Sequence, residues 1–389
     1  MIKSLFIVPQ VTQYRISFFE KLVRQTASLC EWTIIDGEKT IDDGRPSLNA
    51  SFRFPHRRFP ESRLKMGPFL LRKYKGLMSY VQSERPQLIV MGTTPGTLTY
   101  RRITQWCAKN NCRLILWSCL WEDDKVSGSW MHFLKQALTR RFIRSADFHI
   151  TYSSFAKRKL VTWGISPTLI RIAYNGLEIE GQEETALSDE AASALKHSLA
   201  PAGSKVLIYV GGLGFDKKVH LLIEALRDFN IQTPQNNLHT WIIGDGPAAH
   251  QLKKLIKQYN LSQTVTLLGR IVEGVDSYFQ AADCLVLPGC GGLALNQSLY
   301  WGKPCIVSHA DGTEEDLILD RVTGFSFSKG SYKDLATAIH QFYRSSPTNF
   351  EHLRLYGRDM IAKRSNVNYM VSVFIESIEN LLQRKFIHP

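Results

Sequence analysis

Residues Leu285–Ser308 read LVLPGCGGLALNQSLYWGKPCIVS, and they decide the fold of the chain. The apolar start, Leu285–Leu287, predicts a buried parallel strand, because such strands are apolar on both faces. One proline and three glycines then break the strand, and Leu293–Trp301 carries apolar residues at helical spacing. Gly302 and Pro304 end that helix. The stretch therefore predicts a strand, a glycine loop, a short helix and a second strand.

The glycine loop at the start of this helix predicts an anion site. Unpaired backbone N–H groups face outward at such a place, at the positive end of the helix dipole. A phosphate or diphosphate suits these groups. An ordinary strand–helix–strand crossover would have the same pattern, so the rest of the chain has to distinguish the two.

Composition is typical of a globular protein with two domains. The chain has 389 residues, of which 44% are hydrophobic and 21% charged, and this length exceeds a single ordinary core. No apolar run approaches the roughly 20 residues that span a bilayer. The apolar start Met1–Val8 meets Pro9 too early for a signal peptide and predicts a first buried strand. We therefore expect a cytoplasmic protein.

Cysteine and histidine spacing indicates neither a disulfide framework nor a metal site. The seven cysteines contain no C-x-x-C pair, and this favours reduced thiols in the core. The eleven histidines form no pair with ligand spacing. We therefore expect no metal and no cofactor held by the protein.

Positive charge is concentrated in the first half of the chain. Residues 1–180 hold 28 Lys and Arg against 14 Asp and Glu, a net charge of +14, whereas residues 181–389 hold 20 against 21, a net charge of −1. This excess predicts an anionic partner or surface. The most basic segment, Arg53–Lys75, mixes cationic residues with phenylalanines and leucines, which suits an anionic membrane surface. No nucleic-acid-binding motif accompanies it, and a solvated surface loop and helix remains the alternative.

Apolar runs of strand and helix type alternate through the first half. This alternation predicts a parallel, doubly wound sheet with helices on both faces. Ligands of such sheets lie beyond the carboxyl ends of the strands, so we expect Pro9–Arg15, Gly92–Thr97 and Ser118–Lys125 to line a cleft. The runs are Ser4–Val8, Phe18–Val23, Trp32–Ile35, Leu88–Met91, Ile103–Ala108, Arg113–Trp117 and His149–Tyr152.

The alternation restarts in the second half after a polar segment. We predict a first domain over residues 1–178, a linker over 179–203, a second domain over 204–368, and a last helix, 369–389, that packs back on the first domain. Three strands of the second domain end in glycine loops, Gly211–Gly214, Gly244–Pro247 and Gly269–Arg270. Because the carboxyl ends of parallel strands meet at one edge, these loops favour a nucleotide-diphosphate site over a plain crossover.

Eight short motifs occur in a recognisable order over about residues 150–330. They are Ile172–Glu178, Tyr209–Leu213 with Lys217, Gly244–Pro247, Leu268–Arg270, Ala282–Pro288, Gly292–Leu293, Gly302–Pro304 and Thr323–Phe325. In these motifs the chain resembles glycosyltransferase family 4. The resemblance implies the GT-B fold, with two Rossmann-like domains facing a central cleft, and retaining sugar transfer from a nucleotide-diphosphate sugar. It further implies a lipid-linked saccharide acceptor, a role in surface polysaccharide or lipopolysaccharide synthesis, and a peripheral place on the inner face of the membrane.

The resemblance also implies the residues of the site. Lys217 would stabilise charge on the leaving diphosphate, and Glu122 would contact the donor sugar or deprotonate the acceptor. On the acceptor side, Arg15 is expected to bind an acceptor phosphate and Trp121 to stack on a sugar or acceptor ring. The expected donor-binding residues are Gly211, Gly212, Lys217, Gly244, Arg270, Gly289, Gly291, Gly292, Leu293 and Gln297.

The chain departs from the family pattern at three positions. Gly212 stands where the family commonly has arginine, and Gly289 and Gln297 stand where it has two glutamates. Gln297 can still accept a hydrogen bond through its amide oxygen, whereas Gly289 offers only its backbone. The fold leaves open a UDP-sugar epimerase or hydrolase, and the three departures leave open an inactive relative that binds a partner.

Overall fold

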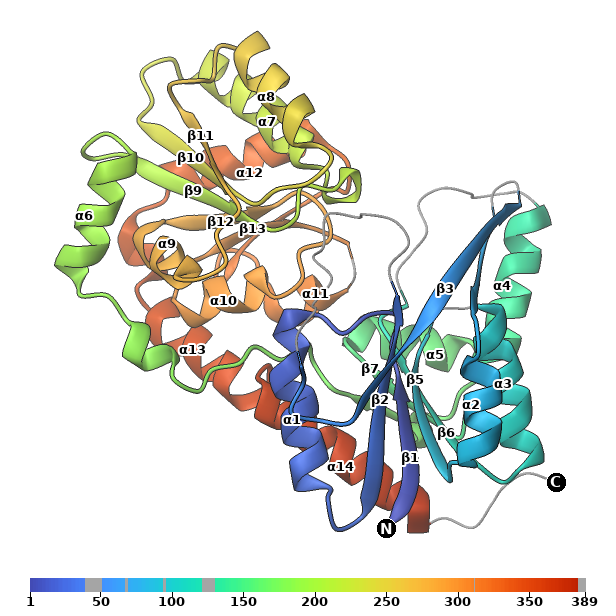
Figure 1. Ribbon diagram of the computed structural model, residues 1–389. Coiled ribbons are helices and arrows are strands. Elements are labelled where there is room, and N and C mark those ends of the chain that lie inside the picture. Colours follow the sequence, from blue (N-terminus) through green and yellow to red (C-terminus); the bar gives the residue numbers. More distant parts are fainter. Residues whose placement is uncertain (39–50, 67–68, 94–95, 121–129, 311, 384–389) are drawn as a thin grey trace. The chain divides into compact units, whose positions relative to one another are not determined.

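The computed structural model describes residues 1–38, 51–66, 69–93, 96–120, 130–310 and 312–383, which form two compact units (Figure 1). The first domain runs to Tyr174 and resumes at Val367, and the second runs from Asn175 to Asn366. Each domain is a mainly parallel sheet with helices on its faces. This architecture confirms the predicted fold class of two doubly wound domains.

The described part of the first domain contains an eight-stranded sheet of order β4-β3-β2-β1-β5-β6-β7-β8. Neighbouring strands are parallel except for the antiparallel pair β3 and β4. The order reverses between β1 and β5, so the topological switch point lies there. The strands are β1 (Ile2–Ile7), β2 (Cys30–Glu38), β3 (His56–Met66), β4 (Phe69–Tyr74), β5 (Leu88–Gly92), β6 (Arg113–Ser118), β7 (Phe148–Thr151) and β8 (Ile170–Ile172).

Two apolar layers sandwich this sheet, because alternate side chains of a strand point to opposite faces. Phe6 and Trp117 lie in the layer formed with α1 and α14, whereas Leu5 and Met91 lie in the layer formed with α2 and α3 (Figure 1). The last helix, α14, belongs to this domain because Phe374 packs on Phe6. The helices are α1 (Ile16–Gln25), α2 (Leu77–Glu84), α3 (Leu98–Lys109), α4 (Trp130–Ile143), α5 (Ser154–Thr162) and α14 (Val367–Gln383).

The basic segment Arg53–Lys75 contains a β-hairpin, β3 and β4, instead of a loop and helix. Alternate side chains of each strand point to the same face of the hairpin, so residues that lie opposite each other, such as Glu61 and Tyr74, can interact across the two strands. Some of its charge is used within the domain. Arg58 donates to both oxygens of Asp36, over 2.9 and 3.0 Å, and Arg63 forms an ion pair with Glu61.

The described part of the second domain contains a six-stranded parallel sheet of order β11-β10-β9-β12-β13-β14. Its switch point lies between β9 and β12. The strands are β9 (Lys205–Val210), β10 (Leu238–Ile243), β11 (Val265–Gly269), β12 (Cys284–Leu287), β13 (Cys305–Ser308) and β14 (Gly324–Phe327). The helices are α6 (Asp189–Leu199), α7 (Val219–Gln232), α8 (Ala249–Gln258), α9 (Val275–Ala281), α10 (Ala294–Tyr300), α11 (Thr313–Leu317), α12 (Tyr332–Arg344) and α13 (Leu353–Arg364).

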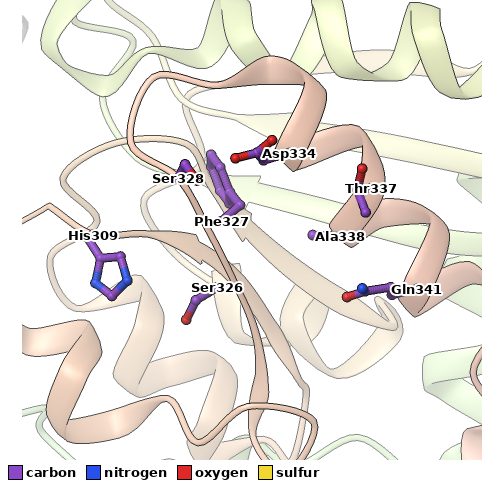
Figure 2. A pocket seen from close by; sticks show the side chains of 8 residues that line it. All are labelled: His309, Ser326, Phe327, Ser328, Asp334, Thr337, Ala338 and Gln341. Carbon is purple, nitrogen blue, oxygen red and sulfur yellow. The ribbon is translucent and has the colours of Figure 1, made fainter.

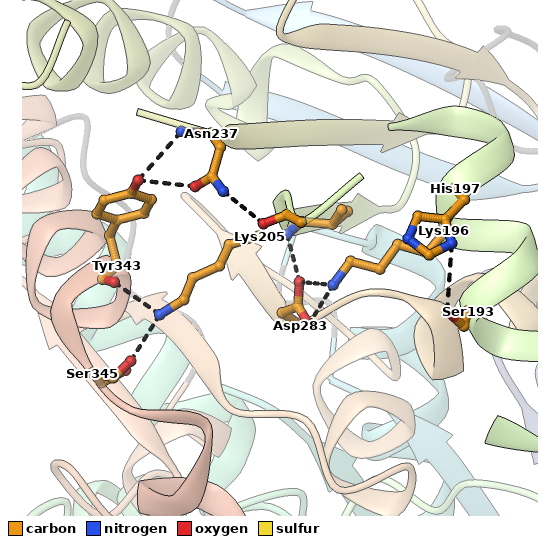
Figure 3. Close-up of polar contacts among 10 residues, drawn as sticks. Ser193, Lys196, His197, Lys205, Asn237, Asp283, Tyr343 and Ser345 are labelled. Atoms are coloured by element: carbon orange, nitrogen blue, oxygen red, sulfur yellow. Dashed lines mark hydrogen bonds and ion pairs between the residues drawn. The ribbon is translucent and has the colours of Figure 1, made fainter. Parts of the chain in front are cut away.

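The segment predicted as a linker, 179–203, differs in the structure, where it is part of the second domain. Its helix α6 packs on α9, and Lys196 Nζ lies 2.8 and 2.6 Å from the two carboxylate oxygens of Asp283 (Figure 3). Asp283 also accepts from the backbone N–H of Val206 at 2.6 Å. The carboxylate thus joins α6 to the starts of two strands, which a polar composition does not reveal.

The two ends of the second domain lie beside each other. The backbone N–H of Leu177 donates to the carbonyl of Ser365 over 2.9 Å, and Leu177 forms a parallel bridge with Asn366. Asn296, on α10, donates to the carbonyl oxygens of Asn175 and Ser365. The entering and leaving segments are therefore held together within this domain.

Candidate active site

The switch point of the second sheet carries the centre of the predicted donor site. Lys217 ends the short 3-10 helix η4 (Phe215–Lys217), which follows β9, and its Nζ donates to the carbonyl of Cys290 over 2.8 Å. Cys290 lies in the loop after β12. Ligands of doubly wound sheets bind where the loops after two neighbouring strands diverge. The structure thus brings Lys217 and the glycine loop of Leu285–Ser308 together at that position.

The glycine loops after β9 and β10 are joined by backbone hydrogen bonds. Gly211 N–H donates to the carbonyl of Ile243 over 3.0 Å, and Leu213 N–H donates to the carbonyl of Asp245 over 2.9 Å. A Cβ at Gly244 would lie 1.9 Å from the carbonyl oxygen of Gly211, and the φ angle of Gly244 is 148°. Gly244 is therefore needed for the close approach of the two loops, and it lies beside the predicted donor site.

Gly289 is enclosed, whereas Gly212 is open. A Cβ at Gly289 would lie 2.8 Å from the carbonyl oxygen of Asp216 and 2.9 Å from that of Lys217, so the backbone of η4 occupies the space of a side chain. A Cβ at Gly212 would meet no atom within 4 Å. The glutamate that the family resemblance implies at Gly289 has no room here, but an arginine at Gly212 would have room.

The remainder of the loop leads into α10, which is shorter than the predicted helix Leu293–Trp301. Gly292 has a φ angle of +71°, which glycine adopts more readily than other residues. Leu293 precedes the helix, and its carbonyl accepts from the N–H of Gln297 over 3.0 Å. Ser308, at the end of β13, donates to the carbonyl of Pro288 over 3.0 Å. The loop with Gly291 and Gly292 is thus anchored at its start by β13.

Gln297 is half-buried and hydrogen-bonded to a residue that the sequence analysis missed. Its Nε2 donates to Asp276 Oδ1 over 2.5 Å, and Trp301 Nε1 donates to the same oxygen over 2.7 Å. Asp276 lies in the first turn of α9. A polar residue 21 positions before Gln297 belongs to no motif, so no local signal could have identified it.

Arg270 lies two strands away in the sheet from the loop that carries Lys217. It follows β11, the edge strand, and its side chain is exposed. Two strand spacings separate β11 from β9, which is roughly 10 Å. A place for Arg270 in the donor site stays a prediction.

Three residues were predicted on the acceptor side of the site. Two of them, Trp121 and Glu122, lie outside the described residues. Arg15 is only 6% exposed, and its guanidinium lies 4.8 Å from the ring centroid of Trp117 and 5.3 Å from that of Tyr152. The end of 3-10 helix η1 (Gln13–Arg15) therefore directs this side chain into an aromatic layer. The structure assigns Arg15 a role in packing, and its predicted contact with an acceptor phosphate stays a prediction.

Buried polar groups without partners lie at the ends of strands and in the loops after them in the first domain. Thr97 follows β5, and Trp117 and Ser118 end β6; their hydroxyl and indole N–H groups are buried and meet no hydrogen-bond partner among the described residues. The same holds for the Thr12 hydroxyl after β1. An unmade hydrogen bond of this kind costs about 1–3 kcal/mol. Such a group of unpaired donors and acceptors marks a place for a polar ligand or water.

Asp36 holds the loop after β1 in place. Its side chain is inaccessible to solvent and accepts from Arg58, from the N–H of Val11 over 3.1 Å, and from His56 Nε2 over 2.9 Å. Burial alone would raise the pKa of the Asp36 carboxyl, but these hydrogen bonds outweigh burial and lower its pKa. The loop is thus fixed by an ionised carboxylate.

A separate cavity of about 340 Å³ lies beside β14 and α12 (Figure 2). Hydroxyl, carboxylate, carboxamide and imidazole groups line it together with one aromatic ring. None of the predicted donor residues is among its lining, which consists of His309, Ser326, Phe327, Ser328, Asp334, Thr337, Ala338 and Gln341.

In the described ranges, no three His, Cys, Asp or Glu side chains come together as metal ligands would. Within the same part of the chain, no helix is long and apolar enough to cross a membrane. The expectation that the protein holds no metal stays a prediction.

A family model supports the reading of these loops. Residues 190–359 match the model described as glycosyl transferases group 1. The second domain matches this family. The match covers most of the second domain and ends before the chain returns to the first domain at Val367.

Two curated relatives of the chain are named as lipopolysaccharide galactosyltransferases. The lipopolysaccharide 1,6-galactosyltransferase of Escherichia coli (strain K12) is 22% identical over 244 residues, which are 58% of this chain and 61% of that protein. The protein of the same name from Salmonella typhimurium is 24% identical over 274 residues, which are 64% of this chain and 70% of that protein. The chain thus spans less than two thirds of the Escherichia coli relative that it matches.

Solved structures share the fold over almost the whole chain. Anabaena Alr3699/HepE in complex with UDP-glucose has a TM-score of 0.72 and 18% identity, and the match covers 98% of this chain and 100% of that chain. The lipopolysaccharide outer core galactosyltransferase WaaB in its apo form has a TM-score of 0.68 and 16% identity, covering 97% and 99%. These similarities show the GT-B fold.

Proposed function

We propose that this protein is a glycosyltransferase of surface polysaccharide or lipopolysaccharide synthesis. It moves a sugar from a nucleotide-diphosphate sugar to a saccharide acceptor. The observation that carries the proposal is the contact of Lys217 with Cys290 across the switch point of the second sheet, at 2.8 Å. The ammonium group and the N–H groups of the glycine loop supply positive potential at one place.

This arrangement suits a diphosphate that gains charge during a reaction. When the bond between the sugar and the diphosphate breaks, negative charge develops on the phosphate oxygens. Lys217 is only 18% exposed, so its charge is less screened by water than that of a surface lysine. A preorganised cation of this kind stabilises the transition state more than the ground state. We propose that Lys217 and Gly291–Leu293 stabilise the leaving group without a metal.

The donor that we propose is a UDP-hexose. The proposal is supported by the names of the two lipopolysaccharide galactosyltransferases and by the UDP-glucose bound to the Anabaena protein. We further propose that the chain belongs to glycosyltransferase family 4 and retains the configuration of the sugar. Gly289 leaves no room for a carboxylate beside Lys217, so any contact at that position comes from backbone groups.

The acceptor that we propose is a lipid-linked saccharide bound by the first domain. Glu122 is the proposed base for the acceptor hydroxyl and Trp121 a proposed sugar contact. The hairpin of β3 and β4 exposes Leu64 and Lys73, which supports peripheral binding to the inner face of the membrane.

A transfer assay with a donor panel tests the function. UDP-galactose, UDP-glucose, GDP-mannose and dTDP-glucose are each incubated with truncated lipopolysaccharide cores, and the lengthened product is measured by mass spectrometry. We expect product and UDP only when donor and acceptor are both present. An epimer or free sugar formed without acceptor would instead indicate an epimerase or hydrolase. A protein whose thermal unfolding shifts with none of these nucleotides would be a partner-binding relative.

Flotation with vesicles tests the membrane part separately. Vesicles rich in anionic lipid should carry the protein, and the double variant L64S/K73E should float less, because it loses an apolar contact and reverses a charge. Lys254→Glu, an equal charge reversal on α8 of the second domain, is the control. Equal flotation of both variants and the wild type would exclude the hairpin as the membrane contact.

A further inference from the structure

A groove of about 870 Å³ runs along α4 of the first domain, and we call it the arginine groove. Arg140, Arg141 and Arg144 line it at the end of the helix. Gln136 and Phe133 continue the lining one and two turns earlier. Positions 133, 136, 140 and 144 are three or four residues apart, so their side chains share one face of the helix.

Two of these arginines are held in place by Trp163, which directly follows α5. Arg144 donates to the carbonyl of Trp163 through two guanidinium nitrogens, over 3.1 and 2.8 Å. The Arg140 guanidinium lies 5.6 Å from the centroid of the Trp163 ring, as in a cation–π contact. Neither partner carries a negative charge. These contacts therefore position the two guanidinium groups and leave their charge uncompensated.

The surroundings of the groove add no compensating charge. Residues 130–163 contain seven Lys and Arg against Asp147 alone, a net charge of +6, and Asp147 lies 3.6 Å from Arg113. In the part of the chain that the structure describes, no carboxylate pairs with any of the three arginines of the groove. One cation in the last turn would complement the helix dipole. Three on one groove provide a site for an anion.

The lining indicates the chemical class of this anion. Guanidinium groups bind phosphate oxygens in pairs, so clustered arginines suit phosphate groups. The rest of the lining includes the Gln136 amide and the Ser145 hydroxyl, which suit sugar hydroxyls. Phe133 is 68% exposed and offers a ring face. A concave site with one large apolar side chain suits a phosphorylated saccharide better than a lipid surface.

The arginine groove lies at the amino edge of the first sheet. Just after Arg144, the N–H of Asp147 donates to the carbonyl of Leu114 at the start of β6. Strand β6 has six residues, a length of roughly 20 Å. Ligands of doubly wound sheets react beyond the opposite, carboxyl edge. A molecule in the groove is thus about one strand length from the expected place of the reacting hydroxyl.

We propose that the arginine groove binds phosphate groups of a phosphorylated saccharide, and that this saccharide is a part of the acceptor remote from the reacting hydroxyl. The acceptor role rests on the proposed function, whereas the binding of a sugar phosphate does not. An acceptor that occupies both the groove and the carboxyl edge is an extended oligosaccharide. The groove adds affinity for that acceptor without touching the reacting atoms.

Calorimetry with glucose 1,6-bisphosphate tests the groove, with saturating UDP present to fill the proposed donor site. The wild type should bind the bisphosphate about tenfold or more tightly than glucose, and less tightly at high salt. R140Q/R141Q keeps the contact of Arg144 with Trp163 and should lower the affinity about tenfold. K253Q/K254Q removes two exposed lysines of α8 and is the control for the equal loss of charge.

A third variant separates the sugar contact from the phosphate contact. Phe133→Ala should weaken the binding of glucose 1,6-bisphosphate about threefold and leave that of inorganic pyrophosphate unchanged. If R140Q/R141Q does not fold, the single variant Arg141→Gln at an exposed position decides.

Transfer kinetics connect the groove to the acceptor. Phosphatase treatment of a lipopolysaccharide core should raise its KM for the wild type about tenfold, with kcat nearly unchanged, because the contact is made equally in the ground and transition states. R140Q/R141Q should show this raised KM with treated and untreated cores alike. A KM that phosphatase does not change would overturn the acceptor role.

The outcomes separate the inference from the proposed function. An active protein that binds glucose 1,6-bisphosphate no more tightly than glucose overturns the inference alone, and so does equal weakening in K253Q/K254Q. Loss of flotation on phosphatidylglycerol vesicles in R140Q/R141Q, with bisphosphate binding unchanged, would assign the arginines to a lipid surface instead. Binding that depends on the arginines in a protein without transfer activity would overturn the proposed function and support the sugar-phosphate site.

Discussion

The two switch points of this protein have the same topology but different residues in their loops. At the second, between β9 and β12, Lys217 contacts the opposite glycine loop. At the first, between β1 and β5, the Thr12 and Thr97 hydroxyls are buried and meet no hydrogen-bond partner among the described residues. A cation beside glycine loops suits an anion, whereas buried unpaired hydroxyls suit water or a small polar group. The topology determines where a ligand binds, and the loop residues determine which ligand.

Net charge alone would place the anion site in the first domain. The first half of the chain carries a net charge of +14 and the second −1, yet the second domain has the proposed diphosphate site. Several cations of the first domain are used internally. Arg15 packs on aromatic rings, Arg58 binds Asp36, and Arg113 lies 3.6 Å from Asp147. An anion site therefore depends on local geometry more than on the charge of the domain.

The largest expected effect distinguishes two glycines of the second switch point. Gly244→Ala should lower the free energy of unfolding by about 3 kcal/mol, because the Cβ would meet the carbonyl of Gly211. Gly212→Ala, at an open position, should change it by about 0.5 kcal/mol or less. Urea unfolding of the full chain measures both. Equal stability of the two variants would mean that the loops are not in close contact.

A buried histidine makes the first domain sensitive to acid. Burial lowers the pKa of His149 to about 4, below its ordinary value of about 6.5. The unfolded chain therefore binds a proton between about pH 6.5 and pH 4 that the folded chain does not. Stability is complete above about pH 6.5 and falls toward about pH 4 by about 3 kcal/mol.

The variant His149→Leu should remove most of this fall, as unfolding measured from neutral pH down to about pH 4.5 will show. His250→Leu replaces an exposed histidine on α8 of the second domain and should leave the pH dependence unchanged. The same steep fall in His149→Leu and the wild type would assign the acid sensitivity to another group.

Lys217→Ala should weaken UDP binding by about 1.5–3 kcal/mol, the scale of a charge-assisted hydrogen bond. Calorimetry with UDP measures the loss, and Lys254→Ala, which removes an exposed lysine of the same domain, is the control. Unchanged affinity would remove Lys217 from the site.

The smallest effect concerns the buried cation of the first switch point. Arg15→Met should lower the stability of the first domain by about 1–2 kcal/mol through lost cation–π contacts, with UDP affinity unchanged. Arg24→Met, at an exposed position of α1, should cost less than about 0.5 kcal/mol. If Arg15→Met is instead stable and raises KM for the acceptor, the predicted phosphate contact was right.

The fold could be predicted because its signals are local. Apolar runs such as Val206–Val210 and Leu285–Leu287 became the buried strands β9 and β12, and the glycines after them became the loops of one sheet edge. Phe18–Val23 and Ile103–Ala108 lie within α1 and α3. The hairpin of β3 and β4 was missed because its basic residues obscure the alternation of a strand.

The site could be predicted only where a motif marks it. Lys217 was identified from a family motif, and its contact lies 73 residues away at Cys290. Asp276 was missed because a single polar residue in a helix has no periodic signal. The burial of Arg15 depends on Trp117, Tyr152 and Met370, which only the folded chain brings together. Long-range polar contacts of this kind leave no pattern in the sequence.

The pairing of Leu177 with Asn366 makes the second domain an insertion in the first. Its ends are held together, so residues 175–366 can be excised as one closed module that includes α6 and the Lys196–Asp283 pair. The first domain is discontinuous in sequence, yet Ala173 and Val367 share one apolar layer. A short engineered linker from Tyr174 to Val367 would make the first domain one continuous polypeptide. We therefore expect each half of the protein to fold when it is produced alone.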